Sequence, residues 1–424
     1  MTSEPVDSLY ADPTMAVRHS YQASLQLAGT KGTDRSRAVQ AMARALDCHQ
    51  DDILEANTLD LEASREMAVP ELVLEWLKLT PERLQITIRA LESLADLPDP
   101  IRRVINATYQ PDRAQTYCQL MPLGVIAFIY EAFPELGAIA AGLCIKTGNS
   151  LILRGSSEAS NSNAAIASAL QSALDEVKLP TASLVPLPSD LGTSIRDLVT
   201  QDRYLSLAIP YGRPSLVQQV LQQATAPVLQ SAMGNCYLYW APSASLEIVH
   251  WMIVDSHCSE PDPVNSIEKV LIHPKHQSSP ALVSLWDRLE KAGFELRGDA
   301  ELVAKFPARL KEIEEIEWSQ AYLTRTIAFR TIEKLEWAID WINDYSSGHA
   351  DCIATESYQE SRIFALGANS ASIYINASPR FSRNPKGGGA IALGMSKQRG
   401  HAQGLISLET LTALKHIVQG NGDL

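Results

Sequence analysis

The sequence predicts an α/β protein with a doubly wound, mostly parallel sheet and a second α/β domain after it. The first observation is the continuous apolar run VIAFIY at 125–130, which is typical of a strand buried on both faces. The second is that such runs alternate with helix-length segments, a pattern that places helices on both faces of a parallel sheet. The third is length, because 424 residues are enough for two or three domains.

The first hundred residues (1–100) are predicted to be helical and to belong to the first domain. In TPERLQITIRALESLADL, Thr80 is a favourable N-cap and Pro81 occupies the first helical position. Apolar residues recur on one face of this segment, and PDP at 98–100 ends it. The alternating, polar segment 101–122 that follows is predicted to be a hairpin or an extended arm.

In residues 123–236 predicted strands alternate with predicted helices, and residues 237–378 show a second such alternation. The predicted strands are VIAFIY, SLILR, SLVPLP, YLSLAIP and APVLQS, and then NCYLYW, IEKVLIH, TIAFRTI and SIYIN. A helix over PELGAIAAGLCIKTGN is closed by Gly148, and the next helix is predicted at 158–177. The final segment, 379–424, holds the glycine-rich loop KGGGA and then a predicted short helix.

Composition and charge exclude several classes of protein. The net charge of 36 − 49 = −13 argues against a nucleic-acid groove or an anionic membrane as the main partner. The N-terminal segment lacks the pattern of a secretory signal, and no window approaches the ~18 uninterrupted apolar residues of a membrane span. The six cysteines are far apart and form no CxxC pair, so we expect reduced thiols, a cytoplasmic location and no metal site.

Two turns after predicted strands are candidate phosphate-binding loops. RGSSEAS, with Arg154 and Gly155, follows one strand, and PYGRPS, with Gly212, follows another. Backbone N–H groups and helix N-termini converge at such turns. Each turn alone is more often only a turn, but both in one sheet favour a nucleotide-binding cleft.

Further features keep more than one interpretation. KGGGA (386–390) is either an anion-binding nest or a surface loop. His349, between SSG and DCIAT, is either a general acid–base or, as we favour, a histidine that caps a helix end. Cys144 and Cys236 lie inside apolar elements and are predicted to be unreactive core thiols.

Several long motifs resemble one known family. LMPLGVIAFIYEAFPELGAIAAGLCIKTGNSLILRGSSEASNSN, SAMGNCYLYW, VNSIEKVLIH, GHADCIATE and HAQGLISLETLTALKHIVQGNG look like gamma-glutamyl phosphate reductase, of the aldehyde dehydrogenase superfamily. The resemblance covers nearly the whole chain, in order. It implies an aldehyde dehydrogenase-like fold with a cofactor domain, a catalytic-type domain and an oligomerisation arm at 101–122. It also implies a homo-oligomer.

The resemblance further implies an activity. Members of the family reduce L-glutamate 5-phosphate with NADPH to L-glutamate 5-semialdehyde and phosphate, a step of proline biosynthesis. A cysteine thiolate attacks the acyl phosphate, and a hydride then reduces the resulting thioester. The retained residues that the resemblance implies for cofactor binding are Lys146, Arg154, Gly155, Gly212 and Gly234.

The nucleophile of this family is absent from its usual position. CSEPDPVNSIEKVLIH (258–273) aligns without a gap with the family segment TQRPSVCNAVETLLVH. Val264 takes the place of the cysteine, whereas Asn265 beside it matches and is a candidate catalytic residue. Cys258 falls on the first residue of the segment and is the candidate for a relocated nucleophile.

Other departures fall on charged positions of the family motifs. They are Phe133 and Tyr211 where the family has arginine, Glu135 for asparagine, Arg213 for glycine, Ala321 and Ala392 for glutamate, and Gln403 for arginine.

Three hypotheses therefore stay open. The first is an active reductase that uses Cys258, with His257 as its base. The second is a non-catalytic protein on the same scaffold that binds a ligand, or associates with glutamate kinase or with a true reductase. The third is an aldehyde dehydrogenase-like reaction on a less charged substrate.

Overall fold

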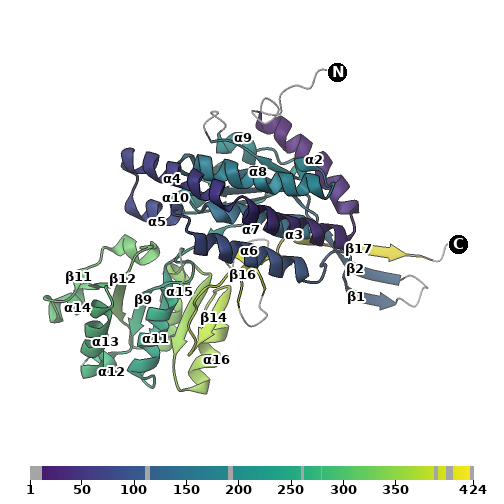
Figure 1. Ribbon diagram of the computed structural model, residues 1–424. Helices are drawn as coiled ribbons and strands as arrows, with labels where there is room; N and C mark the ends of the chain where they lie inside the picture. The colour runs from purple at the N-terminus through teal and green to yellow at the C-terminus, as the bar shows by residue number, and fades with distance from the viewer. Residues whose placement is uncertain are drawn as a thin grey trace. The chain divides into compact units, whose positions relative to one another are not determined.

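Figure 1 shows the computed structural model, which describes residues 12–109, 115–189, 194–258, 262–277, 279–385, 390–397 and 404–420. The chain divides into two compact units. Unit 1 comprises Met1–Gln230, Arg383–Leu393 and Leu405–Leu424, and unit 2 comprises Ser231–Ser382 and Gly394–Gly404. The domain boundary predicted at 236/237 would cut the buried strand β8 (Cys236–Trp240), and the division falls before that strand instead. The glycines of KGGGA lie outside the described residues.

The first alternation forms a four-stranded sheet in unit 1, as predicted. The strand order is β5-β4-β3-β6, and every pairing is parallel. The strands are β3 (Val125–Tyr130), β4 (Ser150–Arg154), β5 (Leu184–Pro186) and β6 (Leu205–Tyr211). All residues of β3 are buried, which confirms the position that its apolar run predicts. At the predicted strand APVLQS, Val228 forms only an isolated bridge with Ala208.

Helices make up most of the rest of unit 1. They are α2 (Pro13–Gly29), α3 (Gly32–Cys48), α4 (Gln50–Glu66), α5 (Glu71–Leu77), α6 (Pro81–Asp96), α7 (Pro134–Lys146), α8 (Ser160–Glu176), α9 (Ile195–Val199) and α10 (Pro214–Gln223). The predicted start of α6 is confirmed, because the Thr80 hydroxyl accepts a hydrogen bond from Arg83 N at 3.2 Å.

The helices lie on both faces of this sheet. On one face Val17 of α2, Leu198 of α9 and Val220 of α10 join a buried cluster with alternate residues of β3. On the other face α7 packs closely, with Gly137 against the ring of Tyr130 from β3. The sheet is therefore doubly wound, as predicted.

Three antiparallel strands form the arm of unit 1. They are β1 (Val104–Tyr109), β2 (Gln115–Pro122) and β17 (Thr412–Gln419), and they lie side by side with β2 in the middle (Figure 1). The hairpin predicted within 101–122 is confirmed. The short helix predicted near the C-terminal end is wrong, because residues 412–419 pair along their full length with β2.

The second alternation forms the seven-stranded sheet of unit 2, in the order β11-β10-β12-β9-β8-β13-β14 with parallel pairing throughout. The strands besides β8 are β9 (Ile267–Ile272), β10 (Glu295–Gly298), β11 (Lys311–Glu312), β12 (Thr326–Thr331), β13 (Ala350–Ala354) and β14 (Ser372–Ile375). The helices are α11 (Leu246–Ser256), α12 (Pro274–Gln277), α13 (Pro280–Lys291), α14 (Ala300–Lys305), α15 (Leu335–Tyr345) and α16 (Tyr358–Gly367). The short strands β7 (Ser231–Ala232), β15 (Ala392–Ser396) and β16 (Gly404–Ser407) form a separate sheet.

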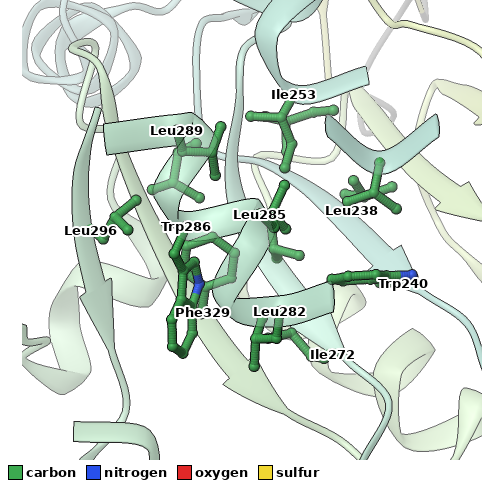
Figure 2. Close-up of a cluster of buried hydrophobic side chains, with 14 of the residues drawn as sticks. Leu238, Trp240, Ile253, Ile272, Leu282, Leu285, Trp286, Leu289, Leu296 and Phe329 are labelled. Carbon is green, nitrogen blue, oxygen red and sulfur yellow. The ribbon is translucent and has the colours of Figure 1, made fainter. Parts of the chain in front are cut away.

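Each face of the sheet in unit 2 has its own core. On the first face α11 and α13 cover the strands, and Figure 2 shows Leu285 and Trp286 of α13 packed among Leu238, Trp240 and Phe329. On the second face α15 and α16 pack against the alternate strand residues. Because the core of the first face holds two fully buried tryptophans, this face anchors the unit.

Among the described residues, no helix is both long and apolar enough to cross a membrane. In the same part of the chain, no group of three or more His, Cys, Asp or Glu side chains could hold a metal ion.

A buried arginine joins three segments of unit 1. Arg35, near the start of α3, is 1% exposed and donates to both carboxylate oxygens of Asp99, at 2.7 and 2.8 Å. Its remaining donors reach the carbonyl oxygens of Thr30, at 2.6 Å, and of Lys146, at 3.3 Å. This guanidinium therefore links the start of α3 to the end of α7 and to the segment that follows α6.

We expect Arg35→Ala to lower the free energy of unfolding by about 3–5 kcal/mol, because it leaves Asp99 and two carbonyl groups without their donor. Arg37→Ala is the matched control, since Arg37 pairs with Asp34 but its side chain is 68% exposed; we expect about 0–1 kcal/mol there. Urea unfolding of the three proteins measures both values. Equal losses in the two variants would contradict the anchoring role of Arg35.

Candidate active site

The first candidate site lies at the carboxyl edge of the sheet in unit 1. The helices that follow the neighbouring strands β3 and β6 cover opposite faces, so the connections diverge between these strands. Open α/β sheets bind ligands at such a point. Glu131 follows β3, Gly212 follows β6, and Arg154 and Gly155 stand at the end of β4. The structure therefore brings Arg154, Gly155 and Gly212 to one edge.

The two turn glycines are explained by contacts inside the protein. A Cβ atom on Gly155 would lie 2.1 Å from Asn163 Nδ2, so the glycine lets the end of β4 approach α8. Gly212 has φ +149°, and a Cβ atom there would lie 2.7 Å from Glu131 Oε2. Close packing is thus sufficient reason for glycine at both positions.

Carboxylates of the chain occupy two helix N-termini at this edge. Asp60 accepts hydrogen bonds from Asn161 N, at 3.0 Å, and Ser162 N, at 2.7 Å, in the first turn of α8. Glu131 accepts from Arg213 N at 2.7 Å, where α10 begins, and from Arg213 Nη2 at 2.7 Å. Because helix N-termini favour anions, two places where a phosphate would bind already hold a carboxylate.

Three of the departures from the family motifs make buried contacts. Phe133 and Tyr211 are fully buried, with ring centroids 6.0 Å apart and nearly perpendicular planes. Phe133 also stacks on Trp76, at 4.7 Å. Glu135 forms a buried ion pair with Arg83. Phe133 and Tyr211 therefore form an aromatic contact, whereas Glu135 has a cationic partner.

Lys146 does not lie at this edge. α7 begins after the carboxyl end of β3 and ends at Lys146, so this lysine lies at the opposite, amino edge of the sheet. Its ammonium donates to Ser36 Oγ, at 2.8 Å, and to Ala95 O, at 2.7 Å. Both contacts of Lys146 are with residues of unit 1. Gly234 belongs to unit 2. Cofactor binding by either residue stays a prediction.

The second candidate site surrounds Val264 in unit 2. Val264 is fully buried and lies in a turn just before β9. Its carbonyl oxygen accepts hydrogen bonds from Gly234 N, at 3.0 Å, and from His349 Nε2, at 2.7 Å. The backbone of this turn is therefore fixed independently of the side chain at 264.

His349 supports the turn at Val264 and does not cap a helix. It is fully buried, its Nδ1 lies 2.8 Å from Ser347 Oγ, and its Nε2 also lies 3.4 Å from Cys236 Sγ. Burial lowers the pKa of His349 to about 4, so the ring is neutral and Nε2 carries the proton donated to Val264. Burial also raises the pKa of the Cys236 thiol well above its ordinary value, which confirms an unreactive core thiol.

Cys258 is exposed. Its Sγ lies 3.4 Å from the carbonyl oxygen of Val254, in the last turn of α11. His257 Nε2 hydrogen-bonds to Ile267 O at 2.9 Å, and burial lowers the pKa of His257 to about 4. The Nε2 atom of the imidazole predicted as a base is thus already hydrogen-bonded to the backbone.

Asn265 and Glu268 also hold backbone. Asn265 Nδ2 donates to Pro379 O at 2.8 Å. The buried Glu268 carboxylate accepts from Asn235 N, Tyr322 N and Leu323 N, at 2.8–2.9 Å. A Cβ on Gly234 would lie 2.7 Å from Glu268 Oε1, which accounts for the glycine with its φ of +67°. These contacts give Asn265 a positioning role.

Sequence reasoning missed the two carboxylates that serve helix N-termini. Asp60 and Asn161 are 101 residues apart, and no motif in the sequence connects them. Glu131 had a usable signal, because an acidic residue directly follows the buried strand VIAFIY. Its partner, Arg213, was noticed only as a departure from a motif.

The fold places the chain in a known class. Residues 7–236 match the aldehyde dehydrogenase family. The chain is 56% identical to gamma-glutamyl phosphate reductase 2 of Synechocystis sp. over 94% of both chains. It is 36% identical to gamma-glutamyl phosphate reductase of Gloeobacter violaceus, over 98% of this chain and 99% of that one.

A solved structure agrees with these relatives. Gamma-glutamyl phosphate reductase from Thermotoga maritima superimposes with a TM-score of 0.88 at 31% identity, covering 97% of this chain and 99% of that one. The chain belongs to the gamma-glutamyl phosphate reductase family, within the aldehyde dehydrogenases. The aldehyde dehydrogenase-like fold expected from the motifs is therefore confirmed.

The environment of His349 predicts how stability depends on pH. The pKa of His349 is lowered in the folded state, so its contribution is fully present above the ordinary pKa of 6.5 and is lost as pH falls toward 4. The amide of His349→Gln can still donate to Val264 O. Between pH ~7.5 and ~5, we expect the free energy of unfolding of this variant to fall by about 2 kcal/mol less than that of the parent. Urea unfolding at both pH values measures this difference. The exposed His416→Gln is the control, and an unchanged acid sensitivity in His349→Gln would contradict the assignment.

Proposed function

We propose that this chain catalyses the reaction for which its relatives are named, the reduction of gamma-glutamyl phosphate. The products are L-glutamate 5-semialdehyde and phosphate, and the pathway is proline biosynthesis. The observation that carries the proposal is the 56% identity with the Synechocystis protein over nearly the whole of both chains. A small-molecule substrate of this kind agrees with the net charge of −13, which disfavours nucleic acid.

Membership of the aldehyde dehydrogenase family indicates a nicotinamide cofactor, which supplies a hydride when bound. We propose NADPH, held at the carboxyl edge of β3, β4 and β6. Arg154 supports this choice, because it stands at the end of the second strand along the chain. In doubly wound folds an acidic residue in this region binds the ribose hydroxyl of NAD, whereas an arginine accommodates the 2′-phosphate of NADP.

The chemistry needs a thiol if it proceeds through a thioester, and this chain has valine at 264. Cys258 is the accessible thiol close to that position in sequence, but it lacks a base and lies at a helix C-terminus. We therefore propose that the parent chain turns over slowly and that the turn around Val264 is still shaped for a nucleophile. The backbone supports from His349 and Gly234 favour this proposal.

A second candidate function rests on one specific observation. Val264 is fully buried and chemically inert, and the apolar contact between Phe133 and Tyr211 removes cationic positions of the family motifs. The alternative to the reductase is a ligand-binding member of the family that does not form a thioester. Such a protein would act beside glutamate kinase or a catalytic reductase.

We also propose that the chain forms a homo-oligomer through the arm of β1, β2 and β17, and that it works in the cytoplasm. The arm exposes large apolar side chains. They are Val104, Ile105, Leu414 and Val418, which are 45–67% exposed. Burying these side chains against the arm of a second copy removes apolar surface from water.

The reverse reaction tests the proposed function. Purified parent protein with glutamate semialdehyde, phosphate and NADP⁺ should form NADPH slowly, in a phosphate-dependent way. Val264→Cys should be faster by about 100-fold or more, because it restores a thiol on an already fixed backbone. Cys258→Ser should abolish the slow turnover of the parent if Cys258 supplies the thiol, with the exposed Cys48→Ser as the control.

The outcomes separate the two candidate functions. Activity in Val264→Cys, with or without a slow parent, supports a scaffold built for the reductase reaction. A family enzyme of known activity is assayed alongside as the positive control. If neither the parent nor Val264→Cys turns over while that enzyme does, the proposal is wrong and the ligand-binding protein is favoured.

Arg154→Gln tests the choice of cofactor. We expect the Kd for NADPH to rise by about tenfold or more, because a charge-assisted hydrogen bond to the 2′-phosphate is lost, whereas the Kd for NADH stays nearly unchanged. Fluorescence titration with each nucleotide measures these constants. A loss of equal size for both nucleotides, or for neither, would contradict a contact with the 2′-phosphate.

A further inference from the structure

Unit 2 contains a second crevice that neither candidate site uses. A cavity of about 430 Å³ opens beside the carboxyl ends of β9 and β12. It lies at the edge of the sheet opposite to Val264, which stands before the amino end of β9. Its volume falls in the range of about 300–1,000 Å³ that is typical of small-molecule sites.

The topology of unit 2 makes this crevice a preferred place for a ligand. β9 and β12 are neighbours and run parallel. After β9 the chain continues to α13 on the first face, whereas after β12 it continues to α15 on the second face. The connections therefore diverge between β9 and β12, and ligands of open α/β sheets bind at the carboxyl ends of such strands. The cavity lies at this point.

Arg330 supplies an anion-binding group to the cavity. Its guanidinium stacks on the ring of Trp341, 3.9 Å from the centroid, and lies 5.9 Å from that of Trp318. Stacking covers a face of the guanidinium and leaves its in-plane N–H donors for other groups. In the part of the chain that the structure describes, the guanidinium of Arg330 forms no hydrogen bond or ion pair. A carboxylate is the group that this planar fork of donors fits best.

The same cavity also carries acceptors for a cation. Glu301 and Glu333 line it. Glu301 Oε1 already accepts from Lys305 Nζ, at 2.8 Å, and from Gln277 Nε2, at 3.3 Å. Glu333 is exposed and has no hydrogen bond or ion pair to the described residues. A ligand with only negative charge would meet these carboxylates, and a ligand with only positive charge would meet Arg330.

The remaining wall is aromatic. Trp337, which is 53% exposed, and the half-buried Trp341 both line the cavity. Lys334 Nζ lies 4.8 Å from the centre of the Trp337 ring, so its charge is close to the same wall. Two indole rings offer an apolar surface next to the separated charges.

We propose that this crevice binds a free α-amino acid as a zwitterion. The carboxylate pairs with Arg330, the ammonium group with Glu333 or Glu301, and the side chain lies against Trp337 and Trp341. The cavity shares no residue with either candidate site described above, and the proposal does not depend on the reductase reaction. An amino acid bound here, at the edge opposite to Val264, is a ligand additional to any substrate.

Calorimetric titration of the purified full chain with the standard amino acids tests this proposal. Each amino acid that binds is then compared with its N-acetyl derivative, which lacks the ammonium group, and with its amide, which lacks the carboxylate. We expect at least one amino acid to bind, and both derivatives to bind about tenfold or more weakly, because each loses a charged pair. The readout is heat of binding, so it is independent of turnover.

Two variants locate the binding. Arg330→Gln should weaken binding by about tenfold or more, and Trp337→Ala provides a second test if Arg330→Gln does not fold. Arg362→Gln is the matched control, because Arg362 also lies over an aromatic ring, that of Tyr358 at 5.9 Å. Any one of three results would overturn the proposal. The first is binding that persists in both Arg330→Gln and Trp337→Ala, the second is equal binding of the N-acetyl derivative, and the third is no binding of any amino acid.

Discussion

The backbone N–H groups at the start of a helix must find acceptors, and in unit 1 the chain supplies its own carboxylates. Asp60 reaches the first turn of α8 from α4, and Glu131 reaches the start of α10 from the end of β3. Each carboxylate satisfies a helix and also sets the spacing between neighbouring elements at the carboxyl edge. The carboxyl edge of this sheet is therefore held by contacts within the chain, and its two helix N-termini already have an anionic partner.

In unit 2 the support of the turn at Val264 is independent of the side chain that it presents. The carbonyl of Val264 is held by Gly234 and His349, and Glu268 holds three backbone N–H groups nearby. No hydrogen bond that holds this turn runs through the side chain at 264, so the turn keeps its backbone contacts whichever side chain stands there.

The sequence was informative wherever a pattern reports burial or capping. The run VIAFIY predicted a central strand, and Thr80 with Pro81 predicted the start of α6, because both signals are local. The short helix predicted after KGGGA is wrong because the strand pairing of residues 412–419 comes from a distant segment. The place of Lys146 at the amino edge was not predictable, because a motif does not say at which edge of a sheet its residues lie. Arg330, whose stacking partner lies on the helix after its strand, carried no motif at all.

The arm has a consequence for synthesis of the chain. Its middle strand, β2, pairs with β17, and facing residues such as Cys118 and His416 are 298 positions apart. At ribosomal rates of about 5–20 residues per second, one edge of β2 waits on the order of tens of seconds for its partner. An unpaired strand edge invites pairing with other chains. On a polysome, where neighbouring nascent chains carry the same uncovered strand, correct closure of the arm competes with exchange between copies during that interval.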